Sequence, residues 1–166
     1  MRIYLIGFMG CGKSSLGKRL ARKLEYPFVD TDMEVEREAG LSVSEIFRQH
    51  GEEAFRQMER DALQRTTSFD KVVVATGGGA PCYLDNMAFM KEHGVSVYLR
   101  MSVQSLVYRL ENARVKRPLL EGLEGDDLLR EISDRLAERE KWYLQANCVI
   151  KGETAKPAHI VALVFG

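Results

Sequence analysis

Short apolar segments alternate with longer amphipathic segments along the whole chain. The apolar segments are rich in valine, isoleucine and leucine and cover residues 3–6, 28–29, 72–75, 95–99 and 148–150. Runs of this kind are typical of strands in a parallel sheet. The segments between them favour helices, because they repeat apolar residues at helical spacing or follow a capping residue, over residues 14–24, 84–93, 102–112, 127–145 and 158–164. This alternation predicts an α/β protein whose parallel sheet is flanked by helices.

One stretch between the second and third expected strands departs from this alternation. Residues 33–68 are rich in Glu, Arg and Gln, contain no plausible strand, and are interrupted by Gly40 and Gly51. Ser42 and Glu45 have the spacing of a capping box, which begins a helix. The pattern predicts a helical insertion.

A second departure comes before the last long helix. Residues 113–126 show no regular period, and a long irregular segment inside a compact domain is typical of a lid or a binding loop. Its basic cluster, residues 114–117, would carry positive charge to a phosphate group during transfer. Solvated surface charge is the alternative interpretation of the cluster.

Chain length and net charge limit which fold and which kind of partner are possible. A chain of 166 residues suits one domain that buries an ordinary core without metal ions or disulfides. Lysine plus arginine and aspartate plus glutamate number 24 each. Without a net positive field, nothing favours nucleic acid or an anionic membrane as partner. We expect a small-molecule partner instead.

Cysteine usage and the first residues indicate the compartment. The three cysteines are widely spaced and form no CxxC or Cys/His cluster, which favours reduced thiols and argues against a zinc site. The first strand is expected from about residue 2, which leaves no room for a signal peptide. No apolar run approaches the length that spans a membrane. We therefore expect a cytoplasmic protein, and we expect a monomer.

The strongest functional motif follows the first apolar run. Residues 7–15 read Gly-Phe-Met-Gly-Cys-Gly-Lys-Ser-Ser and fit the phosphate-binding pattern G-x-x-x-x-G-K-[ST]. In such a loop the glycines let backbone N–H groups surround an anion, Lys13 reaches the outer phosphates and Ser14 offers a hydroxyl to magnesium. A structural turn is the alternative, but the strand before the loop and the helix after it favour nucleotide binding.

Polar and glycine residues also follow the next two expected strands. Asp30 and Asp32 come directly after the second strand, at the sheet edge where ligands of open α/β sheets bind. This favours a ligand role, although Asp32 could instead cap the helix that begins at residue 33. Residues 77–79 are three glycines after the third strand. They favour a second binding loop over a simple turn, because a turn needs only one glycine.

Two pairs of charged residues at helical spacing, each containing arginine, stand out in the remaining helices. Arg56 and Glu59 are three residues apart and share a helix face. Taken alone, a pair at this spacing is usually a solvated salt bridge. Arg135 and Arg139 are four residues apart and lie on one side of the last long helix.

Five features in a fixed order carry a family resemblance: the phosphate loop, Asp30-Thr31-Asp32, Phe55-Arg56-x-x-Glu59, Gly77-Gly78-Gly79 and Arg117-Pro118-Leu119-Leu120. Together they resemble the shikimate kinase family over essentially the whole chain. The resemblance implies a P-loop α/β fold similar to nucleoside monophosphate kinases, with a five-stranded parallel sheet in the order 2-3-1-4-5. It implies one kinase domain over residues 1–166, with a helical substrate-binding insertion at about residues 32–62 and a lid at about residues 112–125.

The resemblance also implies an activity, which is ATP-dependent phosphorylation of the 3-hydroxyl of shikimate in the chorismate route to aromatic amino acids. The partners would be ATP, ADP and shikimate, and the cofactor Mg²⁺. Asp32 would grip the acceptor hydroxyls and could act as the base, while Lys13 and Arg117 would stabilise charge on the moving phosphoryl group. Ser14 would bind magnesium directly, and Asp30 through a water molecule.

The remaining site residues follow from the same resemblance. Those implied to bind ATP are Gly10, Cys11, Gly12, Lys13, Ser14, Ser15, Arg109, Arg117 and Pro118. Those implied to bind shikimate are Asp32, Phe47, Phe55, Arg56, Glu59, Gly77, Gly78, Gly79 and Arg139. Arg56 and Arg139 resemble the pair that binds the substrate carboxylate, and Glu59 would orient Arg56. Cys11 stands where the family often has serine or alanine, and it is either an oxidation-prone thiol or an inert buried one.

Three alternatives remain open at this point. Another small acid or sugar, such as gluconate, could be the acceptor, since two arginines and an aspartate would serve either. A nucleotide-controlled binding module of the GTPase type is disfavoured, because the chain has no N/T-K-x-D guanine-reading motif. A regulatory relative without catalysis is disfavoured by the presence of the five charged residues that the reaction needs, Lys13, Asp32, Arg56, Arg117 and Arg139.

Overall fold

The protein is built on one parallel sheet. A computed structural model describes residues 1–114 and 117–166. Its strands are β1 (Arg2–Ile6), β2 (Phe28–Asp30), β3 (Val72–Ala75), β4 (Val95–Arg100) and β5 (Cys148–Lys151). They form a five-stranded sheet in the order β2-β3-β1-β4-β5, and every neighbouring pair is parallel. The predicted fold class and strand order are confirmed.

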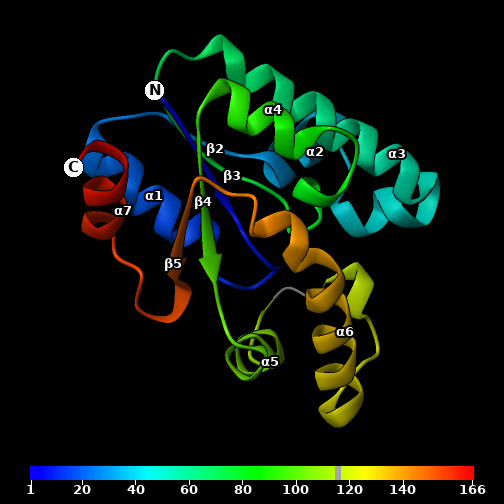
Figure 1. Cartoon of the computed structure of the whole chain (residues 1–166). Helices are drawn as coiled ribbons and strands as arrows, with labels where there is room; N and C mark the ends of the chain where they lie inside the picture. The colour runs from blue at the N-terminus through cyan, green and yellow to red at the C-terminus, as the bar shows by residue number, and fades with distance from the viewer. Residues whose placement is uncertain (115–116) are drawn as a thin grey trace.

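Helices cover both faces of this sheet. They are α1 (Lys13–Leu24), α2 (Thr31–Ala39), α3 (Val43–Arg65), α4 (Asn86–His93), α5 (Val103–Glu111), α6 (Gly125–Tyr143) and α7 (Pro157–Phe165). The connections from β1 to β2 and from β3 to β4 cross the sheet in opposite directions, so right-handed crossovers place their helices on opposite faces. Figure 1 shows α1 and α7 on one side of the strands, with α3 and α6 on the other.

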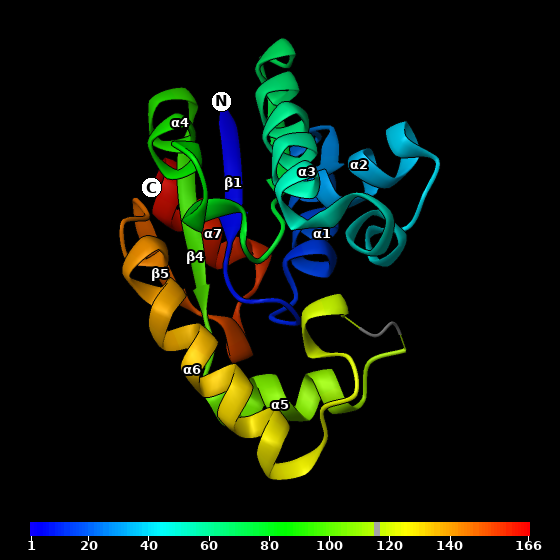
Figure 2. The same cartoon turned by 90° about the vertical axis from the view of Figure 1, so that its right-hand side faces the viewer.

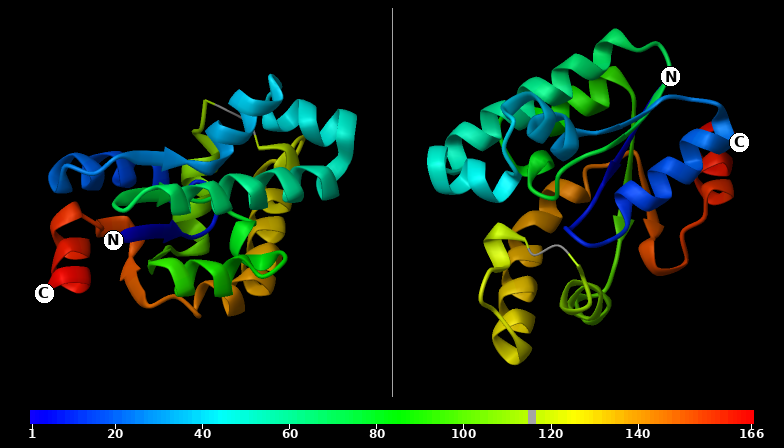
Figure 3. Two further views of the ribbon diagram at one scale, coloured as in Figure 1. Left: turned by 90° about the horizontal axis from the view of Figure 1, so that it is seen from above. Right: turned by 180° about the vertical axis from the view of Figure 1, so that it is seen from behind.

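The other views agree with this arrangement. Helices α1 and α7 contact each other, and they lie side by side when the molecule is seen from behind (Figure 3). Helix α4 contacts β4, and Figure 2 shows α4 and α6 beside that strand.

The core follows the strand order. β1 is the central strand, and Ile3, Tyr4, Leu5 and Ile6 are fully buried. This burial on both faces explains why its sequence is continuously apolar. The helical insertion has a core of its own, made by Val35, Ile46, Phe55 and Ala62 of α2 and α3. The insertion is therefore a packed unit that can hold side chains at fixed positions.

The ends of the insertion helices follow the sequence signals. The hydroxyl of Ser42 accepts a hydrogen bond from the Glu45 backbone N–H at 3.1 Å, as a helix cap does. Gly40 ends α2, and Gly51 breaks α3 with a φ of 85°, a conformation that favours glycine. Both predicted interruptions are confirmed.

The segment before α6 is mostly irregular, as its sequence predicts. Pro118–Leu120 forms a single helical turn with Leu120 buried, and α6 begins at Gly125, slightly earlier than expected. Within the basic cluster at 114–117, residues 115 and 116 lie outside the described residues. In the described ranges, no helix combines the length and the apolar character needed to cross a membrane.

Candidate functional site

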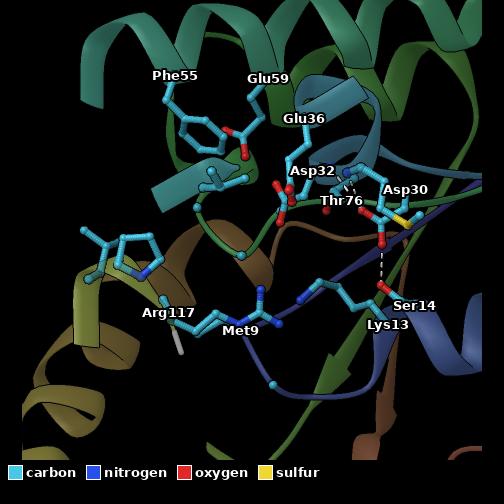
Figure 4. A pocket seen from close by; sticks show the side chains of 18 of the residues that line it. Met9, Lys13, Ser14, Asp30, Asp32, Glu36, Phe55, Glu59, Thr76 and Arg117 are labelled. Carbon is cyan, nitrogen blue, oxygen red and sulfur yellow. Dashed lines mark hydrogen bonds between the residues drawn. The ribbon is translucent and has the colours of Figure 1, made fainter. Parts of the chain in front are cut away.

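A cavity of about 350 Å³ lies at the carboxyl ends of β1, β2 and β3. This is the edge where open α/β sheets bind ligands. Its walls come from the loop after β1, the starts of α1 and α2, helix α3, the loop after β3, and the segment at residues 117–119. In Figure 4, Asp32, Glu36 and Glu59 point into the cavity from one side, and Lys13 and Arg117 from the other.

The phosphate loop forms one end of the cavity. Gly12 has a φ of 93°, which turns the backbone into the first residue of α1. Lys13 is buried, and its Nζ donates to the carbonyl oxygens of Gly7 at 2.7 Å and Phe8 at 3.0 Å. The ammonium group is thus held inside the loop, where the helix N-terminus adds further positive potential. The loop is therefore suited to binding an anion.

Ser14 and Asp30 form the oxygen-rich corner of the cavity. The hydroxyl of Ser14 donates to Asp30 Oδ2 at 2.5 Å. A hydroxyl and a carboxylate are ligands that suit Mg²⁺, which keeps several waters and binds few protein groups. No group of three or more His, Cys, Asp or Glu side chains is arranged to hold a metal ion in the part of the chain that the structure describes. The corner therefore fits a cation that is shared with phosphate oxygens.

The carboxyl group of Asp32 is free to serve the cavity. The interpretation of Asp32 as a helix cap is wrong, because Asp30 Oδ1 accepts from the backbone N–H groups of Asp32 and Met33, and α2 begins at Thr31, two residues earlier than expected. Asp32 Oδ1 is buried and has no hydrogen-bond partner among the described residues. Burial raises the pKa of Asp32, and the nearby Asp30 carboxylate raises that pKa further against the opposing charges of Arg117 and Lys13.

Arg56 and Glu59 form a buried ion pair. Arg56 Nη1 lies 3.0 Å from Glu59 Oε1, and the two side chains are 8% and 1% exposed. The expectation of a solvated salt bridge is therefore wrong, because the packing of α3 turns this face toward the cavity. Burial raises the pKa of Glu59 to about 7, although the positive charge of Arg56 opposes the rise. Only part of the Arg56 hydrogen-bonding capacity is used by Glu59.

Arg139 brings a second buried guanidinium to the cavity. Its Nη1 and Nη2 atoms are buried without hydrogen-bond partners among the described residues. Arg135, one turn earlier on α6, does not line the cavity, and it pairs with Glu131 at 2.6 Å. A buried cation without a partner is costly unless a ligand supplies the opposite charge. Together with Arg56, Arg139 makes this end of the cavity suitable for a small carboxylate.

The three glycines after β3 let the backbone approach these charged groups. A Cβ atom on Gly77 would lie 2.3 Å from Glu59 Oε2, and one on Gly79 would lie 2.5 Å from Arg56 Nη1. The hydroxyl of Tyr143 on α6 donates to the carbonyl oxygen of Gly78 at 2.5 Å. The loop is thus tied to two helices, and side chains on it would displace the groups that line the cavity.

Most of the residues expected at the site meet in this one cavity. The cavity is lined by Gly10, Gly12, Lys13, Ser14, Ser15, Asp30, Asp32, Phe47, Phe55, Arg56, Glu59, Gly77, Gly78, Gly79, Arg117, Pro118 and Arg139. Cys11 and Arg109 do not line it. The Cys11 thiol is buried within the loop, 3.7 Å from Lys13 Nζ. Arg109 is exposed, and its guanidinium lies 3.1 Å from where a Gly12 Cβ would be.

The cavity also includes residues that the sequence analysis missed, which are Met9, Met33, Glu36, Val43, Thr76 and Leu119. Glu36 follows Asp32 by one helical turn, so the spacing in the sequence indicated that both side chains share one helix face. Burial raises the pKa of Glu36, and the charge of Asp30 raises it further. Thr76 directly precedes the glycines. The apolar members carry no chemical signal in the sequence.

Comparison with known proteins identifies the family. The family model described as shikimate kinase matches residues 9–165. The chain belongs to the shikimate kinase family. A shikimate kinase from Parabacteroides distasonis is 42% identical over 152 residues, which cover 92% of this chain and 88% of that protein. The family assignment made from the sequence is confirmed.

Solved structures of the family match the whole fold. Shikimate kinase from Bacteroides thetaiotaomicron superimposes with a TM-score of 0.89 at 41% identity, covering 99% of this chain and 94% of that one. Shikimate kinase from Acinetobacter baumannii, solved in complex with shikimate, gives a TM-score of 0.87 at 34% identity, covering 97% and 88%.

Proposed function

We propose that this protein transfers the γ-phosphoryl group of ATP to the 3-hydroxyl of shikimate, giving ADP and shikimate 3-phosphate. One observation carries the proposal within the shikimate kinase family: a phosphate loop and two buried arginines face each other across a single cavity. The loop suits the donor, and the arginines suit an acceptor that carries a carboxylate. The reaction belongs to the chorismate route to aromatic amino acids.

The phosphate loop binds the nucleotide in this proposal. Backbone N–H groups of residues 10–15 surround the phosphates, and Lys13 exchanges its contacts with loop carbonyls for the outer phosphate oxygens. Arg109 lies against Gly12 outside the cavity, a position suited to packing against the nucleotide base. Pro118 extends the wall near Arg117.

Ser14 and Asp30 hold Mg²⁺ in this proposal, Ser14 directly and Asp30 through a water molecule. The ion, when bound, neutralises part of the negative charge on the transferred phosphoryl group. The support for this site is the contact between the two oxygen ligands at the cavity wall. Ser14 must then release its hydrogen bond to Asp30, while Asp30 keeps its cap on α2 through Oδ1.

The acceptor binds between α3, α6 and the glycine loop. Arg56 and Arg139 bind its carboxylate, and Glu59 holds Arg56 in place. Phe47 and Phe55, whose ring centroids are 4.9 Å apart, pack against the carbon ring. The backbone N–H groups of Gly78 and Gly79 donate to the acceptor, and Gly77 lets the loop approach Glu59.

Transfer itself relies on three charged side chains. Asp32 accepts the hydrogen bond of the 3-hydroxyl and can take its proton as the new P–O bond forms, a role that its raised pKa favours. Lys13 and Arg117 stabilise charge on the phosphoryl group as it moves. The segment at about residues 112–125 closes over the site and excludes water, so that the acceptor is phosphorylated in preference to water.

All these groups come from one chain, and we propose that the protein acts as a monomer.

The test of the function is ADP release from Mg-ATP with shikimate, with gluconate, with quinate and without acceptor. ADP release that depends on shikimate is the expected result. ADP release with gluconate alone, or equal ADP release without any acceptor, would refute the acceptor assignment. The interpretation of the phosphate loop as a nucleotide site would still stand.

A further inference from the structure

The guanidinium of Arg56 is held by more than its buried partner. Besides Glu59, its Nη2 donates to Glu52 Oε1 at 3.1 Å. The aromatic ring of Tyr83 covers it, with 4.1 Å between Arg56 Cζ and the ring centroid. A cation over a tyrosine ring at this distance is attracted by the electron-rich face of the ring.

The hydroxyl of Tyr83 also contacts Glu52, the second carboxylate that binds Arg56. This hydroxyl donates to Glu52 Oε1 at 3.0 Å, and the same oxygen accepts from Arg56. Arg56, Glu52 and Tyr83 therefore form a closed triangle of contacts. Glu52 is 43% exposed, so without the Tyr83 hydroxyl its carboxylate could turn toward water and release Arg56.

The position of Tyr83 links this triangle to the glycine loop. Tyr83 follows Gly79 by four residues, after the single helical turn Ala80–Cys82. Gly79 also touches the Arg56 guanidinium, because a Cβ on Gly79 would lie 2.5 Å from Nη1. One short segment thus contacts the arginine twice, once through backbone and once through an aromatic ring.

We propose that Tyr83 is a positioning residue for acceptor binding, which fixes the plane of the Arg56 guanidinium so that its remaining N–H groups face the acceptor carboxylate. This inference rests on the proposed function. Arginine has several rotatable bonds, and an unfixed guanidinium would have to lose rotamer freedom when the acceptor binds. A guanidinium fixed beforehand avoids that loss and binds more tightly. Tyr83 itself does not line the cavity.

The test compares Tyr83→Ala and Tyr83→Phe with Tyr26→Ala. Tyr26 is a matched control, since it is also half-buried beneath a cation, with Lys71 Nζ 5.9 Å from its ring centroid, and it precedes β2 at the opposite end of the sheet. We expect Tyr83→Ala to raise the KM for shikimate about tenfold. The KM for ATP and kcat should stay within about twofold of wild type. Tyr83→Phe keeps the ring but loses the hydroxyl that holds Glu52, so its KM for shikimate should lie between those of wild type and Tyr83→Ala. Tyr26→Ala should behave as wild type.

A second acceptor separates positioning of Arg56 from general destabilisation. The methyl ester of shikimate lacks the negative charge that Arg56 recognises, so Tyr83→Ala should lower kcat/KM for the ester by less than about twofold. An equal loss for acid and ester, or an unchanged KM for shikimate, would overturn the inference. A wild-type protein that cannot phosphorylate shikimate would instead refute the proposed function and remove the basis of this inference with it.

Discussion

Charged side chains inside the cavity decide what the site can bind. Arg56, Glu59 and Arg139 are almost fully buried, and Asp32 has a buried oxygen without a partner. Among these four side chains, only Arg56 and Glu59 form an ion pair with each other. Burial makes an unpaired charge costly, so the unpaired groups mark where the ligand contributes its own charge and hydroxyls.

Arg139 gives the first prediction at this scale. Arg139→Lys keeps the positive charge but loses the planar pair of N–H donors, so the KM for shikimate should rise at least about tenfold. The KM for ATP should change by less than about twofold, because the phosphate loop is untouched. Arg135→Lys on the same helix is the control, since Arg135 pairs with Glu131 outside the cavity. Equal effects of the two substitutions on the KM for shikimate would rule out the assigned role of Arg139.

Glu59 makes the stability of the protein depend on pH. Its pKa rises from 4.5 to about 7 on burial, so the folded state prefers the protonated form. The contribution of protonated Glu59 to the free energy of unfolding is complete below the pKa that Glu59 has in the unfolded chain. This contribution is lost as pH rises through 7, and the loss is on the order of 3 kcal/mol. Glu59→Gln removes this titration. In urea unfolding, wild type should therefore lose free energy of unfolding relative to Glu59→Gln between pH 5 and pH 8. A relative gain would mean that pairing with Arg56 outweighs burial.

Spacing alone could predict the chemistry of these residues but not their burial. Arg37 and Glu34 are an ion pair three residues apart on α2, with side chains 74% and 33% exposed. Arg56 and Glu59 have the same separation and are buried. The difference comes from the packing of α3 against the sheet edge and the glycine loop. No periodicity within the helix contains that information.

At the scale of elements, the loop after β3 connects the helices at the arginine end of the cavity. It contacts Glu59 and Arg56 of α3, and it accepts a hydrogen bond from Tyr143 of α6. Three glycines in a row signalled a close approach in the sequence. The residues that the glycine loop contacts lie far away along the chain, and only the folded structure shows which residues they are.

Gly79→Ala tests the close approach in that loop. The new Cβ would lie 2.5 Å from Arg56 Nη1, so the guanidinium must move away from its position. We expect about a tenfold rise in the KM for shikimate with little change in the melting temperature. Because Arg56→Lys acts on the same contact, the two substitutions together should raise this KM by less than the product of their separate effects. Fully multiplicative effects would show that Gly79 acts elsewhere.

Most strands and helices could be predicted from sequence, because their apolar periods agree with their final burial. The start of α2 could not be placed correctly. Asp30 and Asp32 are both good caps, and β2 is a three-residue strand, so nothing local decides where it ends. The structure settles the choice through the hydrogen bonds of Asp30, which cap the helix and reach Ser14 at the same time.

At the scale of the whole molecule, strand order explains how one cavity joins the phosphate loop and the two buried arginines. β1 lies between β3 and β4, so the phosphate loop after β1 opens beside the glycine loop after β3. Helices α3 and α6 bring the two buried arginines to the same edge. The strand order could not be read from local patterns, and it followed from the family resemblance instead.

The proposed reaction places a phosphoryl group on one hydroxyl of shikimate. Proton–phosphorus correlation NMR of the product made from Mg-ATP and shikimate tests it most directly, because phosphorus couples to the proton on the phosphorylated carbon. We expect a single product whose phosphorus couples to the proton at carbon 3. Coupling to the proton at carbon 4 or 5, or no phosphorylated shikimate at all, would contradict it.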